Sequence, residues 1–180
     1  MIYLFIGMSC AGKDTLCKEF LKKHKDTVLP IISYTTRPMR ENEVDGVEYN
    51  FVSEEHFKEL IKNDQLTEYR IYNVKVNGND DTWYYGTPKF DFDLSTYDYV
   101  GVVEIKVAKK IVETYGSDNV DITYVIADDA EREKRANLRG SFDKTEWDRR
   151  FQTDKEDFSD KKLNDLEAML NGKPMHLYYN

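Results

Sequence analysis

The stretch IYLFIGMSCAGKDT, residues 2–15, decides the fold of this 180-residue chain. Residues 2–6 are an apolar run that predicts a buried strand, and a helical pattern with one apolar face occupies residues 13–23. Between them, two glycines are separated by four residues and followed by a lysine. A strand, a glycine loop and a helix in this order form the context of a phosphate-binding loop.

Each part of the loop has its own physical task. The glycines permit unusual backbone angles, and successive N–H groups at the start of a helix attract phosphate oxygens. Lys13 supplies positive charge at the phosphate that is transferred. We therefore expect the phosphates of a nucleoside triphosphate to contact Ser9, Cys10, Ala11, Gly12, Lys13, Asp14 and Thr15.

The residue after Lys13 departs from the usual pattern. Ser or Thr normally stands there as a magnesium ligand, whereas this chain has Asp14, with Thr15 one step later. A carboxylate is able to hold Mg²⁺ directly or through water, but it also repels phosphate. Asp14 is the candidate magnesium residue, and the geometry of the metal contact stays open.

The composition predicts one domain with an acidic surface. Lys and Arg number 26 against 34 Asp and Glu, a formal net charge of -8, so the chain repels polyanions and nucleic acid is not expected as a partner.

The apolar start is too short for a signal peptide, and we expect no membrane association. Two cysteines and three histidines without ligand spacing indicate no disulfide framework or zinc site, which favours the cytoplasm. The oligomeric state is not indicated.

The rest of the chain alternates between apolar strand-like runs and helical segments. Further strands are expected at 28–32, 47–52, 97–105, 121–127 and 175–179. Helices are expected after the capping residue Ser53, at 107–115 before Gly116, in the charged region beyond Asp128 and at 161–170, with a loop at 140–145. The fold class is therefore α/β, with a mainly parallel core sheet flanked by helices.

Several separate segments carry a resemblance to a known family. SYTTRPMR at 33–40 precedes Glu43, Gly46, Tyr49, Phe51 and Val52, and then come Glu68, YYGT at 84–87, Arg135, Arg139 and Arg150. Over about residues 1–150 this pattern resembles the guanylate kinase family. The resemblance implies a P-loop nucleoside monophosphate kinase fold in one domain, 1–180. Its core would be 1–32, 91–133 and 151–180, its acceptor-binding flap 33–90 and its Arg-bearing lid 134–150.

The resemblance also implies an activity and a set of site residues. The activity is transfer of the terminal phosphoryl group of ATP to GMP or dGMP, with Mg²⁺ as cofactor and these nucleotides as partners. The implied catalytic residues are Lys13, Arg37, Arg135, Arg139 and Arg150. The implied acceptor-binding residues are Ser33, Arg37, Arg40, Tyr49, Glu68, Tyr85, Thr87 and Glu104.

Three departures keep alternatives open. Lys106 replaces an acid of the family pattern, the stretch 69–84 is longer than usual, and the family's C-terminal helix is not found after Tyr179. The acceptor therefore stays open to another base or to broader specificity. A catalytically inactive binding module on the same fold is the second alternative. A GTPase ranks last, because no Asn-Lys-x-Asp motif occurs.

Overall fold

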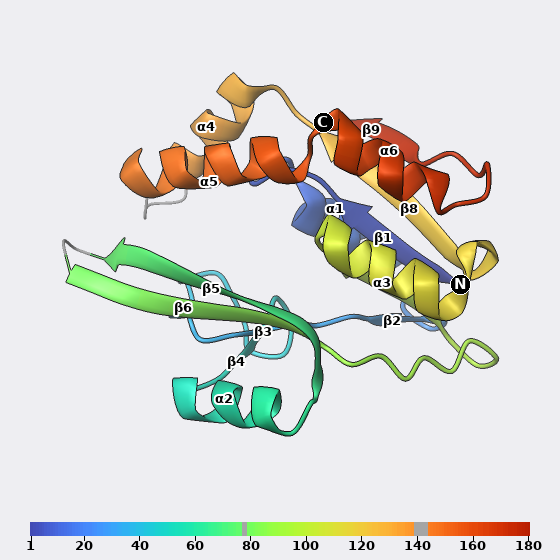
Figure 1. Ribbon diagram of the computed structural model, residues 1–180, viewed down its shortest axis with the longest axis horizontal. Helices are drawn as coiled ribbons and strands as arrows, with labels where there is room; N and C mark the ends of the chain where they lie inside the picture. The colour runs from blue at the N-terminus through green and yellow to red at the C-terminus, as the bar shows by residue number, and fades with distance from the viewer. Residues whose placement is uncertain (77–78, 139–143) are drawn as a thin grey trace. The chain divides into compact units, whose positions relative to one another are not determined.

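The computed structural model describes residues 1–76, 79–138 and 144–180. The chain divides into two compact units, one formed by residues 1–30 with 93–180 and the other by residues 31–92 (Figure 1). The second unit differs by two residues at each end from the flap expected at 33–90. The single-domain organisation itself stays a prediction.

The first unit contains a five-stranded sheet in which every neighbouring pair is parallel. Its strand order is β2-β7-β1-β8-β9, so the first strand of the chain lies in the middle. Parallel strands need crossover connections, and helices supply most of them here. The strands are β1 (Ile2–Ile6), β2 (Val28–Pro30), β7 (Asp98–Val102), β8 (Val120–Ile126) and β9 (His176–Tyr179).

Helices cover both faces of this sheet. Tyr3 and Phe5 point to one face, where both rings contact Phe20 of the first helix at centroid distances of 4.8 and 6.1 Å. Ile2 and Leu4 alternate to the opposite face and are fully buried. The helices of this unit are α1 (Lys13–Lys23), α3 (Ile105–Tyr115), α4 (Asp129–Asn137), α5 (Lys144–Asp157) and α6 (Asp160–Ala168), with a short 3₁₀ helix η1 (Ser117–Asn119).

The second unit is a four-stranded sheet with one helix. Its strand order is β4-β3-β6-β5. Strands β5 and β6, of eleven and ten residues, pair as a long antiparallel hairpin. This hairpin accounts for the longer stretch at 69–84. The elements are β3 (Tyr34–Thr35), β4 (Asn50–Phe51), α2 (Glu54–Lys62), β5 (Leu66–Val76) and β6 (Asn79–Pro88).

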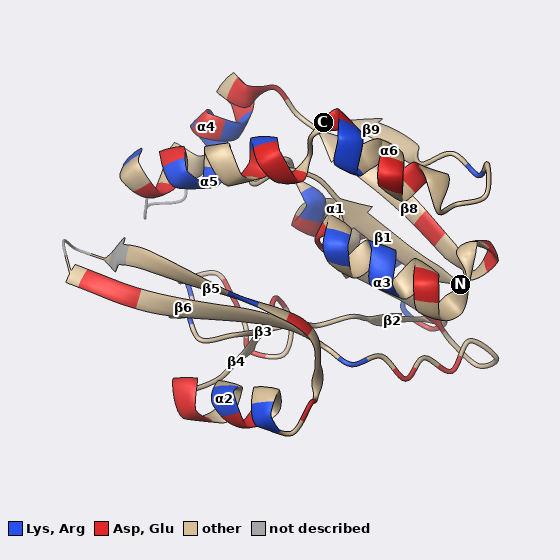
Figure 2. Cartoon of the chain, in the orientation of Figure 1, with Lys and Arg blue, Asp and Glu red and all other residues tan. Residues whose placement is uncertain are grey.

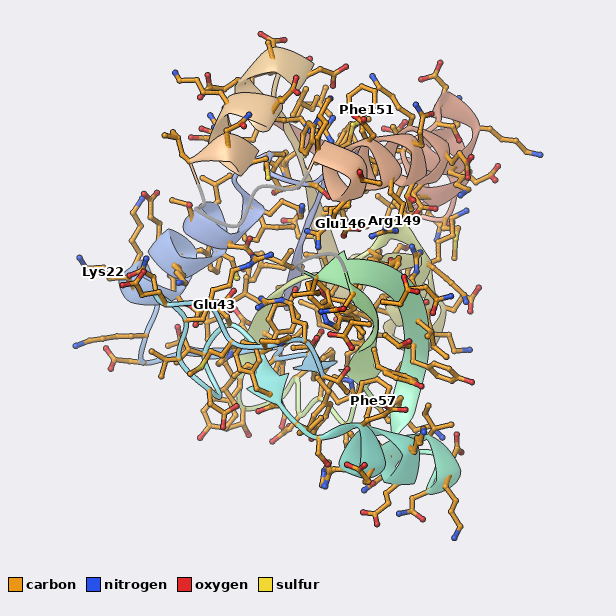
Figure 3. All side chains as sticks on the ribbon, turned by 90° about the vertical axis from the view of Figure 1, so that its left-hand side faces the viewer. Lys22, Glu43, Phe57, Glu146, Arg149 and Phe151 are labelled. Atoms are coloured by element: carbon orange, nitrogen blue, oxygen red, sulfur yellow. The ribbon has the colours of Figure 1, made fainter. Side chains whose placement is uncertain are left out.

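Helix α2 begins and packs as its sequence predicts. The Ser53 hydroxyl accepts a hydrogen bond from the backbone N–H of His56 at 3.2 Å, which satisfies one donor of the first turn. Phe57 and Leu60 are buried against Leu66 in a small core (Figure 3). This core holds α2 on one face of the sheet and leaves the other face for other side chains.

Most predicted elements are confirmed, with shifts at their ends. Only residues 50–51 of the strand expected at 47–52 are extended, because Val47 lies in a turn and is 54% exposed, so it has no core to face. The strand expected at 97–105 ends at 102, since Ile105 already begins α3. The loop expected at 140–145 ends by residue 144, where α5 begins, and most of it lies outside the described residues.

Membrane-spanning segments are missing from the part of the chain that the structure describes. None of its helices combines the length and the apolar character that crossing a bilayer requires.

The small core of the second unit provides a stability test. Phe57→Ala removes a ring with 0% exposure, and we expect the free energy of unfolding to fall by about 3–5 kcal/mol because a cavity is left. Ile71→Ala, at a position 51% exposed on β5, is the control and is expected to change it by about 0.5 kcal/mol or less. Urea unfolding followed by circular dichroism measures both, and equal effects would contradict this account of the core.

Candidate functional site

The glycine loop connects β1 to α1 and has the backbone shape that its sequence predicts. Gly7 has φ +148° and Gly12 has φ +102°, both values that favour glycine. A Cβ atom on Gly7 would lie 2.4 Å from the backbone oxygen of Val125, so no side chain fits between the ends of β1 and β8. Cys10, at φ +60°, adds a third left-handed residue. The loop is therefore a tight concave turn of the kind that holds phosphate.

Lys13 folds back over this loop. Its Nζ donates a hydrogen bond to the backbone oxygen of Met8 at 2.8 Å. Burial lowers the pKa of Lys13, while the carboxylates of Asp14 and Asp154 act in the opposite direction. The ammonium group thus lies at the loop, where a phosphate is able to replace the Met8 carbonyl as its partner.

Asp14 and Thr15 lie in the first turn of α1 and are exposed. Their carboxylate and hydroxyl oxygens are donors that suit Mg²⁺, which is usually held by one or two carboxylates together with substrate phosphates. The described residues contain no cluster of three or more His, Cys, Asp or Glu side chains for a metal. The donor set therefore fits a metal that arrives with a nucleotide rather than one held in a cage of protein ligands.

Arg135, predicted for the lid, contacts the phosphate loop directly. Its Nη1 donates to the backbone oxygens of Cys10 and Ala11 at 3.4 and 3.2 Å, and its Nε to Glu131 at 3.1 Å. Asn180 approaches the same turn, and its Nδ2 donates to Ala11 at 2.8 Å. The sequence offered no signal for Asn180, because 169 residues separate it from Ala11.

Arg150, also predicted for the lid, shares one carboxylate on α5 with its neighbour Arg149. Glu146 accepts two hydrogen bonds from Arg149, at 2.8 and 2.9 Å, and one from Arg150 at 2.6 Å (Figure 3). Burial acts to raise the pKa of Glu146, but the bonds from Arg149 and Arg150 lower it overall. Charges of both signs follow α4 and α5 (Figure 2). Arg139, also predicted for the lid, lies outside the described residues.

Two residues that the sequence did not single out also contact the loop. Arg132 on α4 donates to the backbone oxygen of Ser9, and Asp154 on α5 accepts from the Ser9 backbone N–H. Both lie more than 120 positions along the chain from Ser9, and the charged pattern around Arg132 is equally typical of a solvated helix.

In the second unit, Arg37 is held in place by residues that follow it closely in the sequence. Its guanidinium is paired with the Glu43 carboxylate through two bonds of 2.6 and 2.7 Å, and its side chain is 3% exposed. It also lies 5.2 Å from the Tyr49 ring centroid and 5.3 Å from that of Phe51. Burial acts to lower the pKa of Arg37, but the bond to Glu43 raises it overall. Glu43 is thus a site residue that the resemblance did not assign.

Four of the predicted acceptor residues of this unit, Arg37, Arg40, Tyr49 and Tyr85, are linked by contacts. The Tyr49 and Tyr85 rings are 5.9 Å apart, and Tyr72, which was not predicted, lies 5.6 Å from Tyr85. Arg40 contacts Glu43 at 3.7 Å, and its side chain is 32% exposed. Arg40 and Arg37 share Glu43, and Arg37 lies over the Tyr49 ring. A partly exposed arginine in such a group is suited to a phosphate dianion.

Strand register brings together three further residues that were predicted to bind the acceptor. Glu68 pairs with Thr87 across β5 and β6, so both side chains lie on one face. Ser33 directly precedes Tyr34, which pairs with Gly86, and this places Ser33 beside Thr87. Thr87 is buried and Glu68 Oε2 is shielded from solvent. This face lies opposite the one that carries Tyr84 and α2.

Glu104 is the one predicted acceptor residue in the first unit. It follows β7 and forms the N-cap position of α3, with one carboxylate oxygen shielded from solvent. Because β7 and β1 are parallel neighbours, Glu104 and the phosphate loop lie at the same edge of the sheet. Ligands of open α/β sheets bind at this edge.

Comparison with known proteins assigns the family. The guanylate kinase family model matches residues 1–83. A guanylate kinase of Caldanaerobacter subterraneus is 36% identical over 157 residues, which cover 85% of this chain and 71% of that protein. The chain belongs to the guanylate kinase family. A guanylate kinase of Carboxydothermus hydrogenoformans is 36% identical over 118 residues, which cover 64% of this chain and 53% of that protein. The chain therefore spans about half the length of this second relative.

The fold of this chain is similar to that of a solved guanylate kinase. The crystal structure of guanylate kinase from Anaplasma phagocytophilum matches with a TM-score of 0.53, covering 95% of this chain and 82% of that one. At 18% sequence identity this match supports the fold. The predicted mainly parallel α/β core is therefore confirmed.

The pair formed by Arg37 and Glu43 predicts a pH dependence. Burial acts to raise the pKa of Glu43, yet bonds from Arg37 and Arg40 lower it overall. The pair therefore stabilises the folded chain above the ordinary Glu pKa of 4.5, and this contribution is lost as the pH falls through the lowered value. At neutral pH, Glu43→Gln should reduce the free energy of unfolding by about 3 kcal/mol, and the difference should shrink in acid.

Urea unfolding of wild type and Glu43→Gln from neutral pH to about pH 3 measures this effect. Glu41→Gln removes an exposed carboxylate two residues earlier and is the matched control. A difference between wild type and Glu43→Gln that stays constant across this range would contradict the role given to the ion pair.

Proposed function

We propose that this protein transfers the γ-phosphoryl group of ATP to GMP or dGMP, giving ADP and the nucleoside diphosphate. The observation that carries the proposal is the pairing, within one chain of this family, of a lysine-bearing phosphate loop with an arginine and tyrosine cluster beside Glu68 and Thr87. Only a protein that handles two phosphorylated ligands has use for both. The cytoplasm, which the cysteine content favours, is the proposed location.

The donor nucleotide is assigned to the first unit. The phosphates of the nucleotide lie on the backbone N–H groups of residues 10–15, because the Ser9 N–H is already bonded to Asp154. Lys13 exchanges the Met8 carbonyl for a phosphate oxygen. Arg135 already contacts the loop and adds positive charge there. Mg²⁺ would be held by Asp14 with the nucleotide, and when bound it neutralises phosphate charge.

The acceptor monophosphate is assigned to the second unit. A phosphate dianion takes charge-assisted hydrogen bonds from Arg40 and hydroxyl donors from Tyr49 and Tyr85. Arg37 keeps its pair with Glu43 and supports this cluster with its charge. These residues set the position of the phosphate rather than the identity of the base.

The base is assigned to the face that carries Glu68. Guanine presents two adjacent N–H donors, which a carboxylate accepts, and an O6 acceptor, which suits the hydroxyls of Ser33 and Thr87. Glu104 is a further proposed contact. Adenine lacks the N1–H and N2–H donors and would leave the shielded Glu68 carboxylate without them, so the site discriminates against it.

The chemical step needs no general base. The acceptor phosphate oxygen is ionised near neutral pH and forms the new bond to the γ-phosphorus, while the bond to the β–γ bridging oxygen breaks and ADP leaves with the electron pair. Positioning and charge neutralisation supply the catalysis, through Lys13, Arg135, Arg150 and Arg139. Closure that excludes water suppresses ATP hydrolysis.

An acceptor panel tests the proposal. ADP release is measured with ATP and Mg²⁺ and with GMP, dGMP, AMP, CMP, UMP or dTMP in turn. We expect selective stimulation by GMP or dGMP, and in Glu68→Gln a loss of guanine preference of about tenfold or more, since a charged hydrogen bond is removed. Glu59→Gln, exposed on α2, is the control.

Other outcomes of the panel point to other functions. A different preferred acceptor would make the β5–β6 hairpin a specificity element. Nucleotide binding without turnover on any acceptor would favour a binding module, with Asp14 as the altered residue. An unchanged preference in Glu68→Gln would remove Glu68 from the base site.

Substitutions in the first unit should affect turnover, and substitutions in the second unit should affect acceptor binding. Lys13→Ala is expected to lower kcat by about a hundredfold or more while GMP affinity stays near wild type. Arg40→Ala is expected mainly to raise the KM for GMP, by about tenfold or more. Lys22→Ala, exposed on α1 (Figure 3), should change neither constant. Steady-state kinetics decides this, and the reverse pattern would refute the assignments.

A further inference from the structure

Arg132 is a fully buried arginine in contact with the phosphate loop. It extends from α4 and has 0% exposure, which is rare for a guanidinium. Its Nε donates to the Ser9 backbone oxygen at 2.8 Å, and its Nη1 lies 3.0 Å from Met8 Sδ. One arginine thus contacts two consecutive residues of the loop.

Asp154 holds the same part of the loop from α5. Its Oδ2 accepts a hydrogen bond from the Ser9 backbone N–H at 2.7 Å, and its Oδ1 accepts one from the Ser9 hydroxyl at 3.2 Å. Arg132 and Asp154 also form an ion pair with each other. Together they bind the N–H, the carbonyl and the side chain of Ser9, next to Cys10 with its positive φ.

The charges around this pair are balanced. Asp129 accepts from Arg132 at 2.9 Å and from Lys155 at 2.8 Å, so two cations and two carboxylates alternate. The guanidinium carbon of Arg132 lies 5.7 Å from the ring centroids of both Trp147 and Phe151, which belong to α5. The aromatic rings shield the charges from water and fix the arginine in one place.

Stability alone gives little reason for such an arrangement. Desolvating two charges is costly, and a well-packed apolar pair of similar volume is commonly as stable as a buried ion pair or more so. An apolar pair, however, cannot bind the N–H and the carbonyl of Ser9. What the charged pair adds over an apolar one is the set of hydrogen bonds to the loop.

We propose that Arg132 and Asp154 are positioning residues that hold the phosphate loop in its nucleotide-binding shape before ATP arrives. They act through Ser9 and touch no reacting atom. Because they belong to α4 and α5, the helices that carry Arg135 and Arg150, the pair ties these helices to the loop. The ATP part of this inference rests on the proposed function.

The decisive variant replaces both charges at once. Arg132→Met with Asp154→Leu keeps the site filled and removes the bonds to Ser9. Either single change leaves an uncompensated buried charge beside Lys13, whose surroundings both residues influence, so the double variant is cleaner. Asp157→Asn, which removes a partly exposed partner of Lys162 from α5, the helix of Asp154, is the matched control.

Three measurements follow on the full chain: urea unfolding, hydrogen exchange of the peptide covering residues 8–13, and ATP binding by calorimetry without acceptor. In the double variant we expect a urea midpoint near that of wild type, faster exchange in the loop and a rise of about tenfold or more in the Kd for ATP. GMP affinity should not change, and Asp157→Asn should match wild type throughout.

A double variant that keeps wild-type loop exchange and ATP affinity would overturn the proposal, because the pair would then serve stability alone. If that variant fails to fold, Asp154→Asn is used instead, since it keeps the volume and leaves Asp129 as a partner of Arg132. It removes the charged acceptor of the Ser9 N–H, so we expect faster loop exchange than in wild type and a smaller loss of ATP affinity than in the double variant. Wild-type loop exchange and ATP affinity in Asp154→Asn would also overturn the proposal.

A wild-type chain that binds ATP but phosphorylates no acceptor refutes the proposed function and leaves this inference intact. One that binds no ATP overturns both.

Discussion

The position of β1 in the middle of its sheet is the constraint on which the nucleotide site depends. Backbone hydrogen bonds pair β1 with β7 on one side and β8 on the other, in register along the strand. The chain leaves the C-terminal end of β1 through Gly7, where a Cβ atom would collide with Val125, and the loop leads into α1 at Lys13. A loop anchored between two strands and a helix keeps its N–H groups aimed at one point, which is the requirement for holding phosphate.

The loop is supported by charges from α4 and α5, far along the chain. Arg135 binds its backbone oxygens, and Arg132 with Asp154 encloses Ser9. Buried charges of this kind are tolerated because each has a partner, and their directional bonds specify one arrangement where an apolar contact would allow several. The helices thereby contribute to the shape of a loop that belongs to the opposite end of the sequence.

In the second unit, one face of the sheet carries the core and the opposite face carries the proposed base site. Alternate residues of β5 and β6 point to opposite sides, so Tyr84 packs on Phe57 of α2 while Glu68 and Thr87 lie on the other face. The core on one side keeps the strands in register. That register in turn places a carboxylate beside a buried hydroxyl, an arrangement that no single strand specifies.

Local patterns in the sequence determined the strand, loop and helix over residues 2–23, the Ser53 cap and the strand near the C-terminus. Each depends on neighbours within a few residues, so periodicity and capping chemistry reveal it. The family motifs predicted the site roles of Lys13, Glu68 and the arginines, and these roles stay proposals. Only the tertiary structure decided that Arg132 and Asp154 pair around Ser9 and that Asn180 reaches Ala11. These bonds join residues more than 120 positions apart, and a polar residue carries no local sign of its distant partner, because that partner is chosen by strand order and helix packing.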